Sequence, residues 1–221
     1  MEFQRARSEE QREIRRTAIL DTAAAMLREM PVSDLALNEL SRRVGLAKSN
    51  VLRYFESREA VLLELLDRFF GAWLSELEEQ LATGADGREE MTTRAHRLAD
   101  VLSRSLAEQS VLCDLIAAQG GVLEHNVSTE VVRRHKRSSL ARLATMRMLV
   151  TRHLPELDDG AQRFCFMTLV SAGALSTYVP PPAAVLDAYA DEPELAVVDL
   201  DLRATLRSVV LTTLLGALPR T

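Results

Sequence analysis

The chain has 221 residues, of which 47% are hydrophobic and 27% charged, and its formal net charge at pH 7 is −5. This balance is that of a folded protein and not of a disordered chain. No run approaches the roughly 18 to 20 apolar residues that a membrane helix requires, and the polar start of the chain is unlike a signal peptide. We therefore expect a cytoplasmic protein. Its two cysteines, Cys113 and Cys165, stand in separate apolar runs, so we expect core thiols and no disulfide.

The negative total conceals a basic patch in the N-terminal part. Residues 1–60 hold 11 Lys/Arg and 10 Asp/Glu, so the acidic surplus belongs to the remainder. Between residues 42 and 58 one acidic residue, Glu56, accompanies five cations: Arg42, Arg43, Lys48, Arg53 and Arg58. Local charge matters more than the total for meeting a polyanion, so the total does not exclude nucleic acid as a partner.

Helical periodicity runs along almost the whole chain, without the alternation that indicates β-hairpins. A first helix is expected over 10–30, ending before Pro31. Two short helices follow at 39–44 and 48–55, separated by Gly45, with Asn38 as the expected N-cap of the former. Two short helices around a glycine turn form a helix-turn-helix.

The rest of the chain predicts a larger helical body. Ser57 caps a long helix over 58–81 that leads out of the helix-turn-helix. A break is expected at Gly84–Gly87, a turn at Gly120–Gly121 and a proline-rich acidic loop over 179–199. The further helices are expected over 88–108, 110–119, 128–153, 161–178 and 200–218. The fold class is therefore all-α, with a three-helix domain that contains the helix-turn-helix over 1–57 and a larger helical domain over 58–221.

Polar side chains gather at the start of the second short helix. Val51 and Phe55, four residues apart, face the other way as core anchors. A DNA-reading helix needs small or polar groups at its N-terminal end, with cations or hydroxyls beside it for phosphates. The residues that meet this description are Lys48, Ser49, Asn50 and Arg53.

Each polar group has a role that its chemistry fits. Asn pairs bidentately with adenine and Lys or Arg with guanine, so Asn50, Lys48 and Arg53 are candidates for base reading. Tyr54 and Arg58 are expected to contact phosphates, and Asn38 to reach the groove edge. A charge run alone is usually a solvated face. Here the turn glycine, polar face, aromatic anchor and capped exit helix coincide, which favours DNA binding.

The stretch LSRRVGLAKSNVLRYFESREAVL, residues 40–62, resembles the DNA-binding motif of the TetR family of transcriptional regulators. The resemblance covers about residues 12–65. It implies a homodimer with two DNA-binding heads, a C-terminal domain that holds a small effector, and dimerisation through the last two helices. Leu37 and Leu52 stand where the family often has a hydroxyl residue and a tyrosine, and Arg58 replaces a usual lysine. These departures put two customary phosphate contacts in doubt.

The C-terminal body is expected to bind a small, mostly apolar effector. The candidate pocket residues, each of which is by default a core side chain, are Phe69, Phe70, Trp73, His96, Cys113, Met146, Phe166 and Met167. The small residues 171–174, with the apolar face of the last helix, predict a four-helix dimer interface, or else packing inside one subunit. A two-fold dimer would place two recognition helices about 34 Å apart, which predicts a pseudo-palindromic operator.

Nothing in the sequence assembles a catalytic centre. Four histidines, His96, His125, His135 and His153, share no spacing typical of a metal or acid–base site, and the basic run over 133–137 is typical of a solvated helix face. We expect no enzyme activity, metal or cofactor. The leading hypothesis is a repressor released from its operator by an effector. An activator shares every feature used here, and a ligand carrier or enzyme that has lost DNA binding is the alternative from another class.

Overall fold

The computed structural model of the chain describes residues 2–82, 89–196 and 200–219, with the backbone alone for residues 2–8. All regular elements in this part of the chain are helices, so the expected all-α class is confirmed. The α-helices are α1 Glu2–Met26, α2 Leu37–Val44, α3 Lys48–Val51, α4 Arg58–Ala82, α5 Met91–Ala107, α6 Ser110–Ala118, α7 Thr129–His153, α8 Gly160–Ser176, α9 Ala183–Asp191 and α10 Leu202–Ala217. Shorter turns of helix are η1 Val32–Asp34, η2 Gln119–Leu123, η3 Pro155–Leu157 and η4 Pro193–Leu195.

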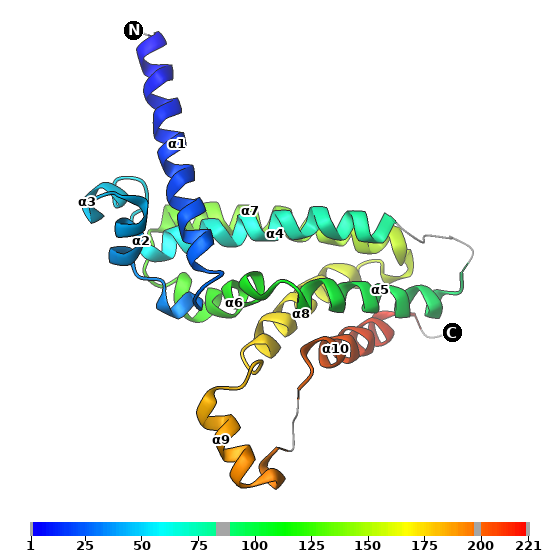
Figure 1. Ribbon diagram of the computed structural model, residues 1–221. Coiled ribbons are helices and arrows are strands. Elements are labelled where there is room, and N and C mark those ends of the chain that lie inside the picture. The colour runs from blue at the N-terminus through cyan, green and yellow to red at the C-terminus, as the bar shows by residue number, and fades with distance from the viewer. Residues whose placement is uncertain (1, 83–88, 197–199, 220–221) are drawn as a thin grey trace.

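The N-terminal head consists of the second half of α1, which packs on α2, and of α3, which packs on α2 in turn (Figure 1). Its core contains the predicted anchors Val51 and Phe55 together with Ile19, Ala23 and Leu40, and each of these side chains is at most 3% exposed. Ser57 accepts a hydrogen bond from the backbone N–H of Ala60 (3.1 Å) and so begins α4 as expected.

The body is a helical bundle in which α4 lies along α7, α5 packs against α10, and α6 against α8 (Figure 1). Helix α8 also contacts α7 and α10 and so joins the two parts of the bundle. At its centre Trp73 is fully buried and donates its indole N–H to Ser105 (3.1 Å). Helix α4 belongs to both parts and connects the head directly to this bundle.

Three segments differ from the expected elements. Helix α1 begins at Glu2 and not near residue 10, because its polar first turns carry no apolar periodicity that would mark them. The expected loop over 179–199 contains α9, whose N-cap is Pro182, since proline is compatible with a helix start. The Gly120–Gly121 turn is a π-helical turn, η2. The break at Gly84–Gly87 lies outside the described residues.

Helix α9 projects away from the rest of the molecule (Figure 1), and none of its residues is buried. Both cysteines, by contrast, lie in the core as free thiols, and burial raises the pKa of Cys113 and of Cys165 to about 12. No helix within the described residues has the length and apolarity to cross a membrane.

Candidate DNA-binding site and effector pocket

The turn between α2 and α3 depends on Gly45. Its φ of 76° lies in the left-handed region, which favours glycine because it has no Cβ. Its backbone N–H bonds to Arg42 O (3.2 Å) and that of Leu46 to Ser41 O (3.0 Å), so the last carbonyls of α2 are satisfied. This closure sets the angle at which α3 leaves the head.

The start of α3 presents the polar side chains to solvent. Lys48, Ser49 and Asn50 are all exposed, as is Arg53 one turn later, whereas Val51 is fully buried. The helix itself is short, and the segment 52–55 continues as tighter turns, with Arg53 N–H on Asn50 O (3.2 Å) and Tyr54 N–H on Val51 O (2.9 Å). The predicted base-reading residues therefore share one exposed surface above a buried anchor.

Arg16 of α1 fixes the end of this recognition segment (residues 48–55). Its guanidinium donates to the carbonyl of Tyr54 (3.1 Å) and lies over the ring of Phe55, 4.4 Å from the centroid. The same group forms an ion pair with Glu64 of α4. One side chain thus joins α1, the recognition segment and α4. Sequence reasoning missed it, because only the tertiary structure brings these three elements together.

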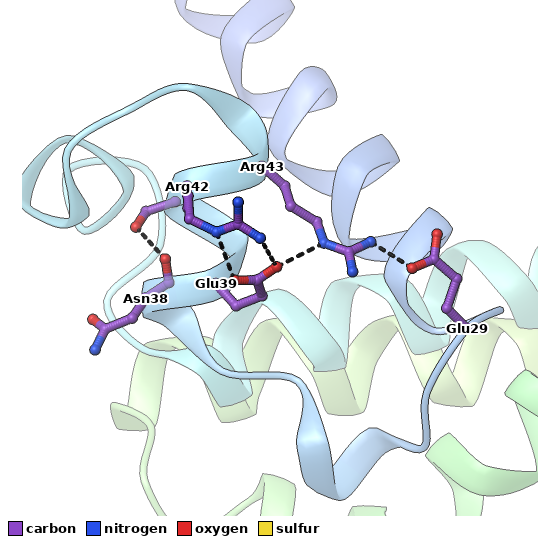
Figure 2. Close-up of polar contacts among 6 residues, drawn as sticks. Glu29, Asn38, Glu39, Arg42 and Arg43 are labelled. Atoms are coloured by element: carbon purple, nitrogen blue, oxygen red, sulfur yellow. Dashed lines mark hydrogen bonds and ion pairs between the residues drawn. The ribbon is translucent and has the colours of Figure 1, made fainter.

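The arginines of α2 are engaged with carboxylates (Figure 2). Glu39 accepts from Arg42 (2.6 Å) and from Arg43 (3.0 Å), and Arg43 also reaches Glu29 (2.6 Å). Hydrogen bonds from Arg42 and Arg43 lower the pKa of Glu39 to about 2. The basic patch read from the sequence is thereby partly compensated, and its cations without an ion pair among the described residues are Lys48 and Arg53.

Asn38 lies inside α2 and is not its N-cap. The helix starts at Leu37 after an extended Ala36, and Ser41 donates its hydroxyl to the Asn38 carbonyl (2.8 Å). The Asn38 amide points away from the α2 ion pairs (Figure 2) and is exposed. It remains a candidate for the groove edge.

Arg58 sits at the first turn of α4, where its guanidinium donates to Val32 O (3.1 Å) and Ser33 O (3.3 Å). These bonds hold η1 against α4. Arg58 thus has a structural role in the head, whereas the sequence predicted a contact with a DNA phosphate. Of the two departures from the family pattern, Leu37 packs partly against the core and Leu52 is 40% exposed.

A cavity of about 450 Å³ lies between α4, α6, α7 and α8. Two of the predicted pocket residues, Phe70 and Phe166, line it. The other six do not: Trp73, Cys113 and Met146 are core residues, Phe69 is half-buried, and His96 and Met167 are exposed on the surface. The sequence could not separate them, because apolar helix positions look alike whether they face a core or a cavity.

One end of this effector cavity is polar. Glu124 accepts from Lys136 (2.7 Å) and from Gln119 (2.8 Å). Burial alone would raise the pKa of Glu124, but these donors outweigh burial and hold it below its ordinary value. The remaining lining is mostly apolar: Leu66, Phe70, Ile116, Leu140, Leu143, Phe166, Leu169 and Val170.

His135 lies beside this polar end, within α7, and is 5% exposed. Its Nε2 is 3.7 Å from Glu124 and 3.4 Å from the Ser139 hydroxyl, and its Nδ1 is buried without a hydrogen-bond partner among the described residues. Burial lowers the pKa of His135, against the pull of Glu124. The side chain also lines a smaller cavity of about 230 Å³ with Arg16 and Glu64, at the junction of head and body.

Two of the small residues of α8, Ala172 and Gly173, serve contacts inside the chain, whereas Ala174 is exposed. Gly173 is buried against α6, where an added Cβ would lie 2.8 Å from Ile116 Cγ2 and 3.0 Å from the backbone nitrogen of Ala117. Ala172 is buried as well, as are Leu206, Val210 and Leu214 of α10. The apolar side chains left exposed on α8 are Phe166, Met167 and Val170, and on α10 Leu215.

A capped helix-turn-helix with an exposed polar helix start, joined by one long helix to a helical body, is typical of a class of DNA-binding regulators. Two family models match the chain: "Bacterial regulatory proteins, tetR family" over residues 19–65 and "Tetracyclin repressor-like, C-terminal domain" over residues 67–221. The chain belongs to the TetR family of DNA-binding transcriptional regulators, which are not enzymes.

Similar proteins agree with this assignment. The HTH-type transcriptional regulator EthR of Mycobacterium tuberculosis is 43% identical over 54 residues, which is 24% of this chain and 25% of that protein. A possible TetR-family regulator of Streptomyces coelicolor has the same fold, with a TM-score of 0.58, 18% identity and coverage of 91% of this chain and 97% of that one. FadR of Thermus thermophilus, solved with lauroyl-CoA, gives 0.54 at 19% identity, covering 93% and 96%.

Proposed function

We propose that the chain is a homodimeric repressor that occupies a pseudo-palindromic operator and leaves it when a small, mostly apolar effector binds the body. The observation that carries DNA reading is the exposed start of α3, where Lys48, Ser49 and Asn50 stand together above buried Val51. Since the proposed target is chromosomal DNA, we place the protein in the cytoplasm.

Helix α8 supports the dimer proposal. Met167 of α8 and Leu215 of α10 are 44 and 46% exposed and do not line the effector cavity, and exposed apolar side chains on neighbouring helices are typical of an interface. Helix α10 packs beside α8, so two copies related by a two-fold axis could form a four-helix interface from these helices. Sedimentation analysis of a Met167→Glu variant tests this: we expect monomers, and an unchanged dimer would contradict the interface.

The effector cavity supports an amphipathic ligand. Its lining is mostly apolar and its polar end is formed by Gln119, Glu124 and Lys136. The fold neighbour from Thermus thermophilus was solved with lauroyl-CoA, a ligand of this character. We therefore propose a ligand with an apolar body and one hydrogen-bonding or charged end.

Helix α4 supports a coupling between the two sites. It supplies Leu66 and Phe70 to the effector cavity, while Glu64 and Arg68 on the same helix form ion pairs with Arg16 and Asp21 of α1. An effector that binds one position of α4 more tightly than another would shift α4. This shift would also move α1 and the recognition segment.

The test of DNA binding is a mobility-shift titration of the purified chain with the DNA upstream of its own gene, at several salt concentrations. We expect a salt-sensitive and sequence-selective shift. No shift at any salt concentration would favour a ligand carrier instead. A reporter strain that lacks the gene then separates a repressor, whose loss raises expression, from an activator, whose loss lowers it.

A further inference from the structure

The first half of α1 lies outside the packed head and has two faces of opposite charge. The helix rises beyond α2 and α3 (Figure 1), and residues 9–15 are all exposed. At 100° per residue Arg12 and Arg15 fall on one side, whereas Glu10 and Glu13 fall on the other. Such segregation of charge is not required for packing, because no residue of this stretch is buried.

The basic face of α1 and the end of the recognition segment enclose one open polar groove of about 430 Å³. Helix α1 contributes Gln11, Arg12 and Arg15, and the recognition segment contributes Arg53 and Tyr54. We call this the α1 groove. The acidic face of the helix borders a separate depression that contains Glu10, Glu13 and Asp21, so the carboxylates do not line the α1 groove.

The three arginines of the α1 groove are uncompensated. Within the described side chains none of Arg12, Arg15 and Arg53 lies at ion-pair or hydrogen-bond distance from a carboxylate. This distinguishes them from the neighbouring Arg16 and Arg43, which are held by Glu64, Glu29 and Glu39. Like charges around one space repel each other, and an anion placed there relieves the repulsion.

We propose that the α1 groove binds phosphates of the DNA backbone beside the bases that α3 meets. The proposal rests on the proposed DNA-binding function, since Arg53 is itself one of the predicted base-reading residues and Tyr54 directly follows it, which makes the groove continuous with the DNA face. Guanidinium groups bind phosphate oxygens bidentately, and a Tyr hydroxyl adds a further donor. Helix α1 is then a DNA-contacting element in its own right and not only a support for α3.

Contacts to phosphate carry no base information, so this groove raises affinity for all duplex DNA equally and adds to its salt dependence. The test compares wild type with Arg12→Gln/Arg15→Gln by fluorescence anisotropy, on a selected operator duplex and on a random duplex of equal length, across a salt series. Arg137→Gln/Arg147→Gln is the matched control, because these exposed α7 arginines carry the same charge and lie outside the site.

We expect the Arg12/Arg15 variant to bind both duplexes roughly ten- to a hundredfold more weakly at about 0.1 M salt, and the slope of log K against log salt to fall by about two per bound head. Arg12→Lys/Arg15→Lys should retain the slope because it retains the charge. Circular dichroism identifies any variant with a lost helix. Phosphate-ethylation interference should show phosphates at which ethylation weakens wild type but not the Gln variant.

Three results would overturn the α1 groove as a phosphate site: an unchanged salt slope, a loss confined to the operator duplex, or an equal loss in the α7 control. If wild type itself does not distinguish the operator from random DNA, the result contradicts the proposed function as well as the proposal for the groove. If wild type is selective and the Gln variant equals it, the groove proposal alone is wrong.

Discussion

Asn50 stands at the exposed start of α3 with its amide free to meet a base edge, and an Asn amide pairs bidentately with adenine. We predict that Asn50→Ala weakens binding to the operator by about 1–3 kcal/mol and relaxes the choice of base at a few positions. Competition titrations with single-base operator variants measure both effects. An equal loss on operator and random DNA would show that Asn50 does not read bases.

Arg16 offers a contrast, because its guanidinium is already committed to Glu64, the Tyr54 carbonyl and the Phe55 ring. We predict that Arg16→Met lowers the free energy of unfolding by about 1–3 kcal/mol and weakens operator binding, while the salt slope stays as in wild type. Urea unfolding and the same salt series test this. A slope reduced by about one per head would mean that Arg16 meets a phosphate directly.

His135 makes stability depend on pH. Its pKa is lowered by burial below the ordinary value of 6.5, with Glu124 and Asp67 opposing and Lys136 assisting that shift. The native state therefore takes up this proton at lower pH than the unfolded chain does. The stability that comes from keeping the ring neutral is fully present above the ordinary pKa and is lost as pH falls through it.

Thermal unfolding between about pH 7.5 and about pH 5.5 tests this effect. We predict that the Tm of wild type falls more over this range than that of His135→Gln. His153, whose pKa is also lowered by burial, then by Arg97 and Arg152, remains in both proteins and supplies the common background. Equal falls in the two proteins would contradict the role given to His135.

At the scale of elements, the succession of α2, turn, α3 and α4 could be predicted from local features of the sequence. These features are the Gly45 turn, the Val51 and Phe55 anchors, and the Ser57 cap. Helix α9 was expected as loop, because Pro180 to Pro182 and the acidic residues after them resemble one. The start of α1 before residue 10 cannot be predicted from hydrophobic periodicity, because the sequence there has none. Hydrophobic periodicity thus predicts helices that pack against the core and does not detect helices that remain exposed.

The same limit explains which features of the candidate sites could be predicted from the sequence. The exposed face of α3 could be predicted, because it depends on residues within two turns of one helix. The pairing of Arg43 with Glu29, the anchoring by Arg16 and the lining of the effector cavity depend on contacts between distant segments. Those required the structure.

The packing of α8 on α6 gives a prediction at this scale. Gly173→Ala places a Cβ 3.0 Å from a backbone nitrogen, which cannot move aside as a side chain would, so we expect a loss of about 1–3 kcal/mol of stability. Gly216→Ala on α10 is the matched control, because no atom of the described residues lies within 4 Å of its added Cβ. Alanine favours a helix, so the control should gain up to about 1 kcal/mol. Equal changes in urea unfolding would refute the close α6–α8 contact.

On the scale of the whole molecule, one helix, α4, belongs to both the head and the effector cavity. In the proposed function, effector binding would therefore reach the head through this shared helix. If the proposed dimer forms, two heads face one side of the duplex, and any shift of α4 changes the separation of two recognition segments. Crystals with and without an effector that show unchanged separation would contradict that coupling.

The most direct test of the central claim is genome-wide selection of DNA fragments by the purified protein. We predict enrichment of a pseudo-palindromic sequence whose half-sites have centres about 34 Å, or one helical turn, apart. Asn50→Ala should still retain DNA but should relax the preference for particular bases at a few positions of that sequence. Recovery of fragments with no shared sequence, at every salt concentration used, would contradict the account.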